Sequence, residues 1–340
     1  MAYIKLSSSN YFHNLDQISK KAGGKEKIFA VLKDNAYGHG LKEMANLAHQ
    51  YGIKRVIVKD LREADEIENL FEETLILSQI PKGIIKKGIS ITINRIDDLF
   101  HLPQKSNIHL KIDSGMHRNG IQEEETEAAF KLIKDKKLNL KGIMTHFRSA
   151  DDLSSELFWQ RENWKKIKKQ VLKFCKKYDI SIPSFHSCNS AALFRLKSCD
   201  DDFVRCGIAT YGYLETDEIF GTFDLKAVLS LWAEKLSSRL LKKGERAGYG
   251  GIFRADRSMI ISTYDIGYGD GFFRADGTKE LFTDSNKKIL GRVSMDNFIC
   301  EGENREIEVL NNAKKMAKHF NTISYEITTK LSPFLKRVVV

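Results

Sequence analysis

Ionisable side chains follow several short apolar runs of this sequence. Lys33 comes directly after the run IFAVL, in the segment VLKDNAYGHG, and Lys111 ends a similar run in HLKIDSGMHRNG. His146 follows GIMT, and Arg205 lies in FVRCGIATYGY. A lysine that the end of a strand lifts out of bulk water can form a Schiff base with a carbonyl compound. Covalent chemistry at a lysine, supported by further cations, is therefore the first hypothesis that the sequence suggests.

Each of these residues also has an ordinary structural explanation. Lys33 alone is typical of a surface lysine, Lys111 and Arg118 are compatible with rim salt bridges, and His146 with a buried structural imidazole. Ser190, in FHSCNSAAL, is typical of a helix N-cap. Five polar clusters after five strands are harder to explain separately. Together they predict a basic pocket for an anionic ligand such as a phosphate or a carboxylate.

The elements that must position these residues alternate between short strands and helices. The expected strands are Ile28–Leu32, Arg55–Val58, Thr74–Leu77, Ile89–Ile93, Ile108–Ile112, Leu140–Thr145, Ser184–His186 and Phe203–Arg205. Helical patterns such as Gly40–Tyr51 and Leu61–Phe71 lie between them. This alternation predicts parallel βαβ units, and eight units would close into an α/β barrel whose chemistry lies at the C-terminal strand ends. A doubly wound open sheet is the alternative.

The pattern changes after about Thr222. Beyond it the sequence predicts strands at Leu225–Leu240 and Ser258–Tyr264, a strand-like run at Ile289–Cys300 and one helix at Ala313–Phe320. We therefore expect an α/β chain of two domains. The first is an eight-stranded parallel TIM-type barrel over residues 1–222, and the second is a mainly β domain over residues 223–340.

The charge of the chain favours no polymeric partner. The 340 residues include 55 Lys and Arg against 45 Asp and Glu, a formal charge of +10. Many lysines fall in Glu162–Lys177, where apolar residues recur at helical spacing and the lysines fill a solvated face. No recognition motif accompanies them, so we expect no nucleic-acid partner.

Cysteine usage and the lack of long apolar runs point to the cytoplasm. The five cysteines are scattered, and neither they nor the nine histidines show a metal-binding spacing. We therefore expect reduced thiols and no metal site. No apolar run approaches the length of a membrane span, and the first residues do not resemble a secretion signal.

The motifs together resemble the bacterial alanine racemases, pyridoxal-phosphate enzymes of fold type III. The resemblance covers nearly the whole chain, and the matching segments occur in the same order as in the family. These segments are VLKDNAYGHG, KIDSGMHRNG, THFRSAD, NSAAL, VRCGIATYG, GYGG, IGYGDG and GRVSMDN. The resemblance implies a barrel followed by a β domain, and an isomerase that supplies D-alanine for peptidoglycan.

The resemblance assigns cofactor contacts to residues of the barrel. Lys33 corresponds to the lysine that bonds to pyridoxal 5'-phosphate, and Arg205 to the arginine that faces its ring nitrogen. His146 corresponds to a residue that bridges this arginine and a catalytic tyrosine. The contacts to the phosphate group correspond to Tyr37, Ser190 and the backbone amides of Gly207 and Ile208.

The resemblance also implies a homodimer whose two active sites are shared between subunits. Lys33 and Tyr249 correspond to the two bases that act on opposite faces of the amino acid. Arg118 and the backbone amide of Met295 correspond to the groups that hold the substrate carboxylate. Supporting positions correspond to Lys111, which is carbamylated in many members, to Tyr268 at the substrate entrance and to Asp296.

Three departures from the family pattern concern the same site. Ser294 stands where relatives often have cysteine, Cys206 replaces a proline after the arginine, and Val339 occupies the approximate position of a C-terminal tyrosine. Two alternatives to alanine racemisation remain at this stage. One is a racemase of broader specificity that acts on serine or lysine, and the other is a pyridoxal-phosphate carrier without turnover.

Overall fold

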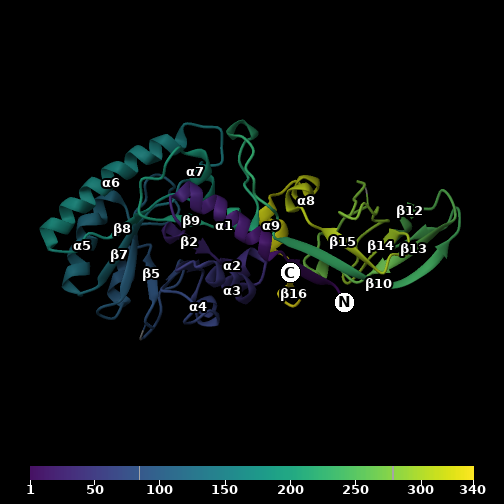
Figure 1. Ribbon diagram of the computed structural model, residues 1–340, viewed down its shortest axis with the longest axis horizontal. Coiled ribbons are helices and arrows are strands. Elements are labelled where there is room, and N and C mark those ends of the chain that lie inside the picture. The colour runs from purple at the N-terminus through teal and green to yellow at the C-terminus, as the bar shows by residue number, and fades with distance from the viewer. Residues whose placement is uncertain (84, 278) are drawn as a thin grey trace. The chain divides into compact units, whose positions relative to one another are not determined.

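The computed structural model describes residues 1–83, 85–277 and 279–340, and its contacts divide the chain into two compact units (Figure 1). The barrel unit comprises Phe12–Ala36 and Met44–Lys226. The β unit comprises Met1–Tyr11, Tyr37–Glu43 and Ala227–Val340. The first strand of the chain and the short segment Tyr37–Glu43 therefore belong with the C-terminal half.

Eight strands form the sheet of the barrel unit, in the order β8-β7-β6-β5-β4-β3-β2-β9. Every pair of neighbours is parallel. The strands are β2 (Ile28–Val31), β3 (Arg55–Val58), β4 (Glu73–Ile76), β5 (Ile89–Ile93), β6 (Asn107–Lys111), β7 (Asn139–Met144), β8 (Ser184–His186) and β9 (Val204–Cys206). All eight predicted strands are confirmed to within one residue at each end.

The order of these strands excludes an open sheet. The last strand, β9, pairs with the first, β2. Its other neighbour is β8, which it meets through backbone bonds from Asp202 N and Phe203 N to Phe185 O and from Arg205 N to Cys188 O. The sheet is a nearly closed barrel, so the prediction of a barrel is confirmed and the doubly wound alternative is wrong.

Helices cover the outside of the barrel strands. They are α1 (Ser8–Ala22), α3 (Leu41–Tyr51), α4 (Leu61–Glu66), α5 (Thr126–Asp135), α6 (Glu156–Tyr178) and α7 (Ser190–Arg195). Helix α6 lies outside β7 and β8 (Figure 1) and buries Trp164, Ile167, Val171 and Cys175 at helical spacing. The lysines between them stay at the surface, as the periodicity predicts.

The β unit is built on the long strand β10 (Leu229–Leu241). Its antiparallel neighbours are β1 (Tyr3–Leu6), β13 (Met259–Tyr264) and β15 (Glu306–Leu310). Strand β14 (Phe298–Glu301) pairs with β13, and β16 (Lys336–Val339) runs parallel to β1. A separate two-stranded ribbon pairs β11 (Arg246–Ala247) with β12 (Phe253–Arg254).

Two predictions for the C-terminal half need correction. The run Ile289–Cys300 is mostly irregular, because Gly291 takes a φ of 75° and Ser294 N closes a turn onto Asn297 O. Only β14 forms at its end. The predicted helix is confirmed as α8 (Ala313–Phe320), but a second helix, α9 (Ser324–Thr329), follows it.

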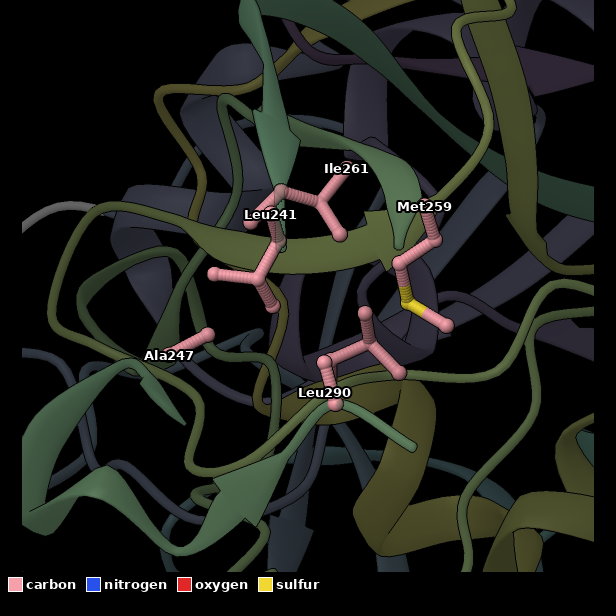
Figure 2. Packing of buried hydrophobic residues seen from close by; sticks show 6 residues of the cluster. Leu241, Ala247, Met259, Ile261 and Leu290 are labelled. Atoms are coloured by element: carbon pink, nitrogen blue, oxygen red, sulfur yellow. The ribbon is translucent and has the colours of Figure 1, made fainter. Parts of the chain in front are cut away.

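A small apolar cluster packs beneath the end of β10 (Figure 2). Its buried members are Leu241, Ala247, Ala255, Met259, Ile261 and Leu290. Since side chains alternate between the two faces of a strand, Leu241 enters this cluster while its neighbour Leu240 points to solvent. Leu241 is 6% exposed and Leu240 is 56% exposed.

Replacing Leu241 by alanine should destabilise the β unit. The change removes buried methyl groups and leaves a cavity, so we expect a loss of about 2 to 5 kcal/mol in the free energy of unfolding. Denaturant unfolding followed by tryptophan fluorescence, to which Trp232 of β10 contributes, measures the loss. Leu240→Ala is the matched control and should change the stability by less than about 0.5 kcal/mol. Equal effects of the two substitutions would contradict the packing described here.

Candidate active site

Lys33 lies just beyond β2, at the start of a turn with unusual backbone geometry. The segment α2 (Lys33–Tyr37) has φ between 51° and 55° at Asp34, Asn35, Ala36 and Tyr37. A left-handed conformation costs roughly 1 to 2 kcal/mol for each non-glycine residue. Strain of this kind persists only where surrounding contacts enforce it, and it is concentrated at functional sites.

Contacts around this left-handed turn hold it in place. Asn35 N donates to Glu63 Oε1 at 2.9 Å, and Asp34 Oδ1 pairs with Lys59 Nζ at 2.8 Å. Burial raises the pKa of Glu63. Lys33 Nζ lies 3.8 Å from Asp34 Oδ2. The turn therefore fixes the backbone on which Lys33 is presented at the end of its strand.

Lys111, the last residue of β6, is buried among positive charges. Its side chain lies in the barrel with only 7% of the residue exposed. Desolvation, reinforced by the charges of Arg205 and Arg118, lowers the pKa of Lys111 to about 8. Arg118 itself is exposed, and no described residue forms a hydrogen bond or ion pair with its guanidinium. It is available to an anion from solution.

His146, two residues beyond β7, is the neutral centre of this group. Burial lowers its pKa well below the ordinary value, and the charges of Arg205, Lys111, Arg118 and Lys33 act in the same direction. The structure thus brings the four predicted cations within electrostatic range of one imidazole. At neutral pH this imidazole is uncharged, so it can both donate and accept a hydrogen bond.

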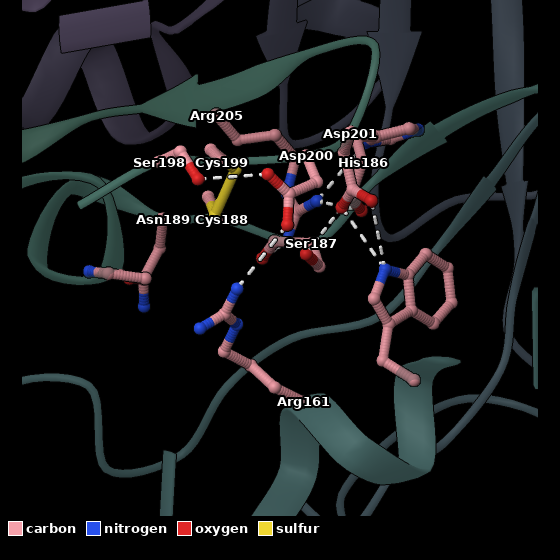
Figure 3. Close-up of a disulfide and its surroundings, with 12 residues drawn as sticks. Arg161, His186, Ser187, Cys188, Asn189, Ser198, Cys199, Asp200, Asp201 and Arg205 are labelled. Atoms are coloured by element: carbon pink, nitrogen blue, oxygen red, sulfur yellow. Dashed lines mark hydrogen bonds and ion pairs between the residues drawn. A yellow bond between two sulfur atoms is a disulfide. The ribbon is translucent and has the colours of Figure 1, made fainter. Parts of the chain in front are cut away.

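Arg205, in β9, is held from several sides (Figure 3). Its Nη1 donates to Nδ1 of His186 at 3.1 Å and to the His186 carbonyl. Its Nη2 donates to the carbonyls of Thr145 at 2.6 Å and Ser187 at 3.0 Å, and lies 3.5 Å from His146 Nδ1. Burial lowers the pKa of Arg205 to about 10, so the group is still charged at neutral pH. None of the described residues accepts a hydrogen bond from its Nε–H.

Ser190 and the segment after β9 form a second polar group. Ser190 Oγ accepts from the backbone N–H of Gly207 at 3.2 Å and of Ala209 at 3.4 Å. The helix N-cap is Asn189, whose side chain accepts from Ala192 N, so the N-cap explanation of Ser190 is wrong. In the part of the chain that the structure describes, the N–H of Ile208 has no acceptor. A hydroxyl and a backbone N–H are therefore available to bind an anion.

Three of the predicted residues gather on neighbouring loops of the β unit. Tyr268 N donates to Ser294 O at 3.0 Å, and Gly269 N donates to Met295 O at 2.8 Å. Asp296 follows and is exposed. The loops meet so closely that a Cβ on Gly267 would lie 2.1 Å from Met295 O, which explains the glycine. Tyr268 and Met295 are 40% and 55% exposed.

Tyr249 and Tyr37 lie elsewhere in the β unit. Tyr249 begins the short helix η6 (Tyr249–Gly251) and is 68% exposed, so its phenol projects from the unit. Tyr37 is buried, with its ring 5.9 Å from that of Tyr325. Arg337 Nη2 donates to the carbonyl of the next residue, Gly38, at 2.9 Å. Tyr325 and Arg337 were not predicted, because their partners lie about 290 residues earlier in the chain.

The contacts of His186 with Arg205 were also not predicted. His186 lies in the segment FHSCNSAAL, in which Ser190 is predicted as a site residue. Its place at the end of a predicted strand, on the same rim as Lys111 and Arg205, was the available signal.

The expectation of five reduced thiols is wrong for one pair. Cys188 and Cys199 form a disulfide that spans helix α7 (Figure 3). Their Cα atoms come within 6.7 Å because the chain returns along the helix before β9, a proximity that their spacing in sequence does not reveal. Cys175, Cys206 and Cys300 are free and buried. Burial raises the pKa of the Cys206 thiol to about 12, so this residue next to Arg205 is an uncharged thiol.

Comparison with known families covers both halves of the chain. Residues 6–215 match the model of the alanine racemase N-terminal domain, and residues 228–339 match that of the alanine racemase C-terminal domain. The chain is 52% identical over 337 residues to an alanine racemase of Nitratiruptor sp., with 99% of each chain covered. It is 46% identical to an alanine racemase of Campylobacter jejuni over the full length of both.

Solved structures give the same result. An alanine racemase of Clostridium difficile superposes with a TM-score of 0.90 at 25% identity, covering all of this chain and 95% of that one. An alanine racemase of Bacillus anthracis with bound L-Ala-P has a TM-score of 0.86 at 26% identity, with the same coverage. A histidine racemase of Leuconostoc mesenteroides shares the fold, with a TM-score of 0.84 at 24% identity.

The lowered pKa of Lys111 predicts how stability depends on pH. Below pH 8 this lysine is charged in both the folded and the unfolded chain, so burial of the charged amine lowers the free energy of unfolding. Above about pH 10.5 the lysine is neutral in both states. Between these values the unfolded chain binds more protons, so stability rises with pH. In carbon-dioxide-free buffer, the difference in free energy of unfolding between the wild type and Lys111→Met should therefore shift by about 2 to 3 kcal/mol in favour of the wild type between pH 7 and 10.

Denaturant unfolding of both proteins at the two pH values measures this gain. Lys131→Met, a substitution of an exposed lysine in α5, is the control and should show no change between pH 7 and 10 relative to the wild type. A constant stability difference between wild type and Lys111→Met would show that Lys111 is not desolvated.

Proposed function

The chain belongs to the alanine racemase family, and we propose that it interconverts L-alanine and D-alanine with pyridoxal 5'-phosphate as its cofactor. One observation carries the proposal beyond family membership. Lys33, Lys111, Arg118 and Arg205 lie within electrostatic range of the neutral His146, at and just beyond the carboxyl ends of the barrel strands. Such a group suits a ligand with both an aldehyde for a lysine and negative charges for the other cations.

The residues of the barrel unit fit pyridoxal phosphate. Lys33 has the primary amine that bonds to the aldehyde, and the unsatisfied Nε–H of buried Arg205 suits a ring nitrogen, which can accept a hydrogen bond. Ser190 and the N–H of Ile208 suit the phosphate. We assign the N–H of Gly207, which donates to Ser190 Oγ here, and Tyr37 of the β unit as further phosphate contacts. A donor of fixed positive charge at the ring nitrogen disfavours its protonation.

Two bases are needed because racemisation removes a proton from one face of the substrate Cα and returns one to the other. When bound, the cofactor withdraws electrons from the amino acid and makes this proton removable. We assign the removal and return of the proton on the D face to Lys33 Nζ, and the removal and return of the proton on the L face to the phenol of Tyr249. His146 would connect Tyr249 to Arg205 and accept or donate a hydrogen bond there.

The substrate carboxylate would bind Arg118 and the backbone amide of Met295. Arg118 is suited because its guanidinium is exposed and has no partner among the described residues. Tyr268 and Asp296, beside Met295, would form the entrance of the site.

Lys111 would support Arg118 after reaction with carbon dioxide. An amine with a pKa of about 8 is partly neutral at physiological pH. It can attack CO₂ to form a carbamate, with release of one proton. The product replaces a cation between two guanidinium groups by an anion, so repulsion becomes attraction. The same electrostatics that lower the pKa of Lys111 thus favour its carbamylation.

Sharing of the active site between two copies explains the exposure of the β-unit residues. Tyr249, Tyr268 and Met295 present 68%, 40% and 55% of their surface to solvent, unusual for groups that must exclude water from chemistry. We therefore propose a homodimer in which each β unit completes the site of its partner. The product D-alanine would serve peptidoglycan synthesis in the cytoplasm. No helix in the described ranges is long and apolar enough to span a bilayer.

Cofactor binding and racemisation test this function directly. The purified protein should take up pyridoxal phosphate with a new visible absorbance band and should convert either enantiomer of alanine into the racemate, followed by polarimetry. Lys33→Ala should lose both the band and at least about 10³-fold in racemisation, because it removes the covalent partner of the cofactor and one base. Racemisation that Lys33→Ala leaves intact would refute the site.

Mixing two inactive variants tests the shared site. Lys33→Ala and Tyr249→Phe each abolish one base. If sites are shared, a heterodimer of the two holds one site with both changes and one with neither. An equal mixture after subunit exchange should then recover about a quarter of wild-type activity. No recovery, in a mixture shown by mass spectrometry to contain heterodimers, would place both bases in one chain.

A further inference from the structure

A row of polar side chains crosses the interior of the barrel and ends on Arg205. Glu73 begins β4, His109 lies in β6 and His186 ends β8. Alternate strands of an α/β barrel supply the side chains of one interior layer, so these three can meet. His109 Nε2 is 2.9 Å from Glu73 Oε1, and His109 Nδ1 is 2.8 Å from His186 Nε2. His186 Nδ1 is 3.1 Å from Arg205 Nη1.

The two imidazoles of the row are almost completely buried, and the row reaches a cavity at its Glu73–His109 end. His109 is 1% exposed and His186 is fully buried. The ring of Phe29, from β2, stacks on His186 at 5.5 Å and meets His109 edge-on at 6.0 Å. Glu73, whose side chain is 18% exposed, lines a cavity of about 660 Å³ together with Ser90. In so dry an interior, an unsatisfied or misdirected N–H would be costly.

The proton positions along the row follow from its two ends. A guanidinium can only donate, so His186 Nδ1 must accept from Arg205. His186 then carries its proton on Nε2 and donates it to His109 Nδ1. His109 in turn donates from Nε2 to the carboxylate of Glu73. Every hydrogen bond therefore runs in the same direction, from Arg205 to Glu73, and both imidazoles are neutral Nε2–H tautomers.

The pKa shifts of Glu73 and His186 fit the roles of these two groups in the row. Burial would raise the pKa of Glu73, but the hydrogen bond and electrostatic attraction of His109, the hydrogen bond from Ser90 and the charge of Arg55 outweigh it and hold the pKa below its ordinary value. Glu73 is therefore an ionised acceptor. Burial lowers the pKa of His186 far below the usual range, so His186 is neutral.

We propose that Glu73 is a positioning residue for Arg205. By accepting from His109 it fixes the tautomers of His109 and His186, and it thereby keeps the acceptor atom of His186 facing the guanidinium. Without Glu73 the row has no terminal acceptor, and both imidazoles can reverse their tautomers. An Nδ1–H of His186 would then oppose the Nη1–H of Arg205 and displace the guanidinium, together with its Nε–H.

The proton positions along the row follow from the hydrogen bonds of the protein and do not depend on its function. The effect of Glu73 on catalysis rests on the proposed function, because that proposal assigns Arg205 to the cofactor ring. Displacing Arg205 should impair proton transfer more than substrate binding, since the proposed contact of the carboxylate is Arg118 and not Arg205.

The first experiment determines the tautomers in the wild-type protein. Nitrogen-15 NMR of the full-length protein loaded with pyridoxal phosphate and labelled in histidine distinguishes protonated from unprotonated ring nitrogens. His109→Gln and His186→Gln assign the signals. We expect an unprotonated Nδ1 and a protonated Nε2 in both residues. A cationic His186, or one protonated on Nδ1, would overturn the proposal without any variant of Glu73.

The second experiment removes the terminal acceptor. Glu73→Leu should change the tautomer signals of both histidines and lower kcat about tenfold, with KM changed less than about twofold, as when an outer partner of a site residue is lost. Glu73→Gln, whose amide oxygen still accepts, should keep the tautomers and lose less than about threefold in kcat. The same substitutions at Glu72, whose side chain is 56% exposed and pairs with Lys54, should change neither.

The outcomes separate this proposal from the proposed function. Unchanged tautomers and unchanged kcat in a folded Glu73→Leu would refute the positioning role. If Glu73→Leu does not fold, the wild-type spectrum and Glu73→Gln test the proposal instead. Reversed tautomers in Glu73→Gln would show that the charge of Glu73, and not its hydrogen-bond acceptor, fixes the tautomers, and would refute the proposed role. A wild type with the expected tautomers but no racemisation of any amino acid would refute the proposed function and leave the role of Glu73 standing.

Discussion

The buried guanidinium of Arg205 is the interaction on which the barrel mouth depends. Strands β7 and β8 end just where Arg205 lies, so the carbonyls of Thr145, His186 and Ser187 are free to accept its hydrogen bonds. These carbonyls belong to the ends of two strands and the donors to a third, so one side chain ties β7, β8 and β9 together. The planar fork of an arginine suits this role, because its donors have fixed directions that a lysine lacks.

Holding this cation in place leaves the mouth with an excess of positive charge. Burial lowers the pKa of both His146 and Lys111, and the neighbouring cations lower them further: Arg205, Lys111, Arg118 and Lys33 for His146, and the two guanidinium groups for Lys111. Like charges crowded in a partly dry site are stabilised by anions. In the function proposed above, a phosphate, a substrate carboxylate and a carbamate on Lys111 would each supply negative charge to this site. The proposed affinity for anionic ligands and the proposed modification of Lys111 would then have one electrostatic origin.

The sequence predicts the barrel well because its signals are local. Each strand is a short apolar run between helices, and residues at the strand ends share one rim whatever the details of packing. The contacts that were missed are long-range. Strands β1 and β16 pair across more than 300 residues, Cys188 meets Cys199 across a helix, and Tyr37 meets Tyr325. The left-handed turn at Asp34–Tyr37 was missed for another reason, since no glycine marks it and tertiary contacts impose it.

The distance between Glu73 and Arg205 is itself informative. A carboxylate in direct contact with Arg205 would form an ion pair, would occupy its donors and would weaken the positive potential that the site uses. Two neutral imidazoles placed between them avoid this outcome. Each imidazole fixes which atom of the next group donates and which accepts, an effect that needs only direct contact between neighbours. The negative charge of Glu73 meanwhile stays at the opposite end of the row, beside the cavity. The arrangement therefore orients the guanidinium without neutralising it, which is what a cationic donor at the mouth of the barrel requires.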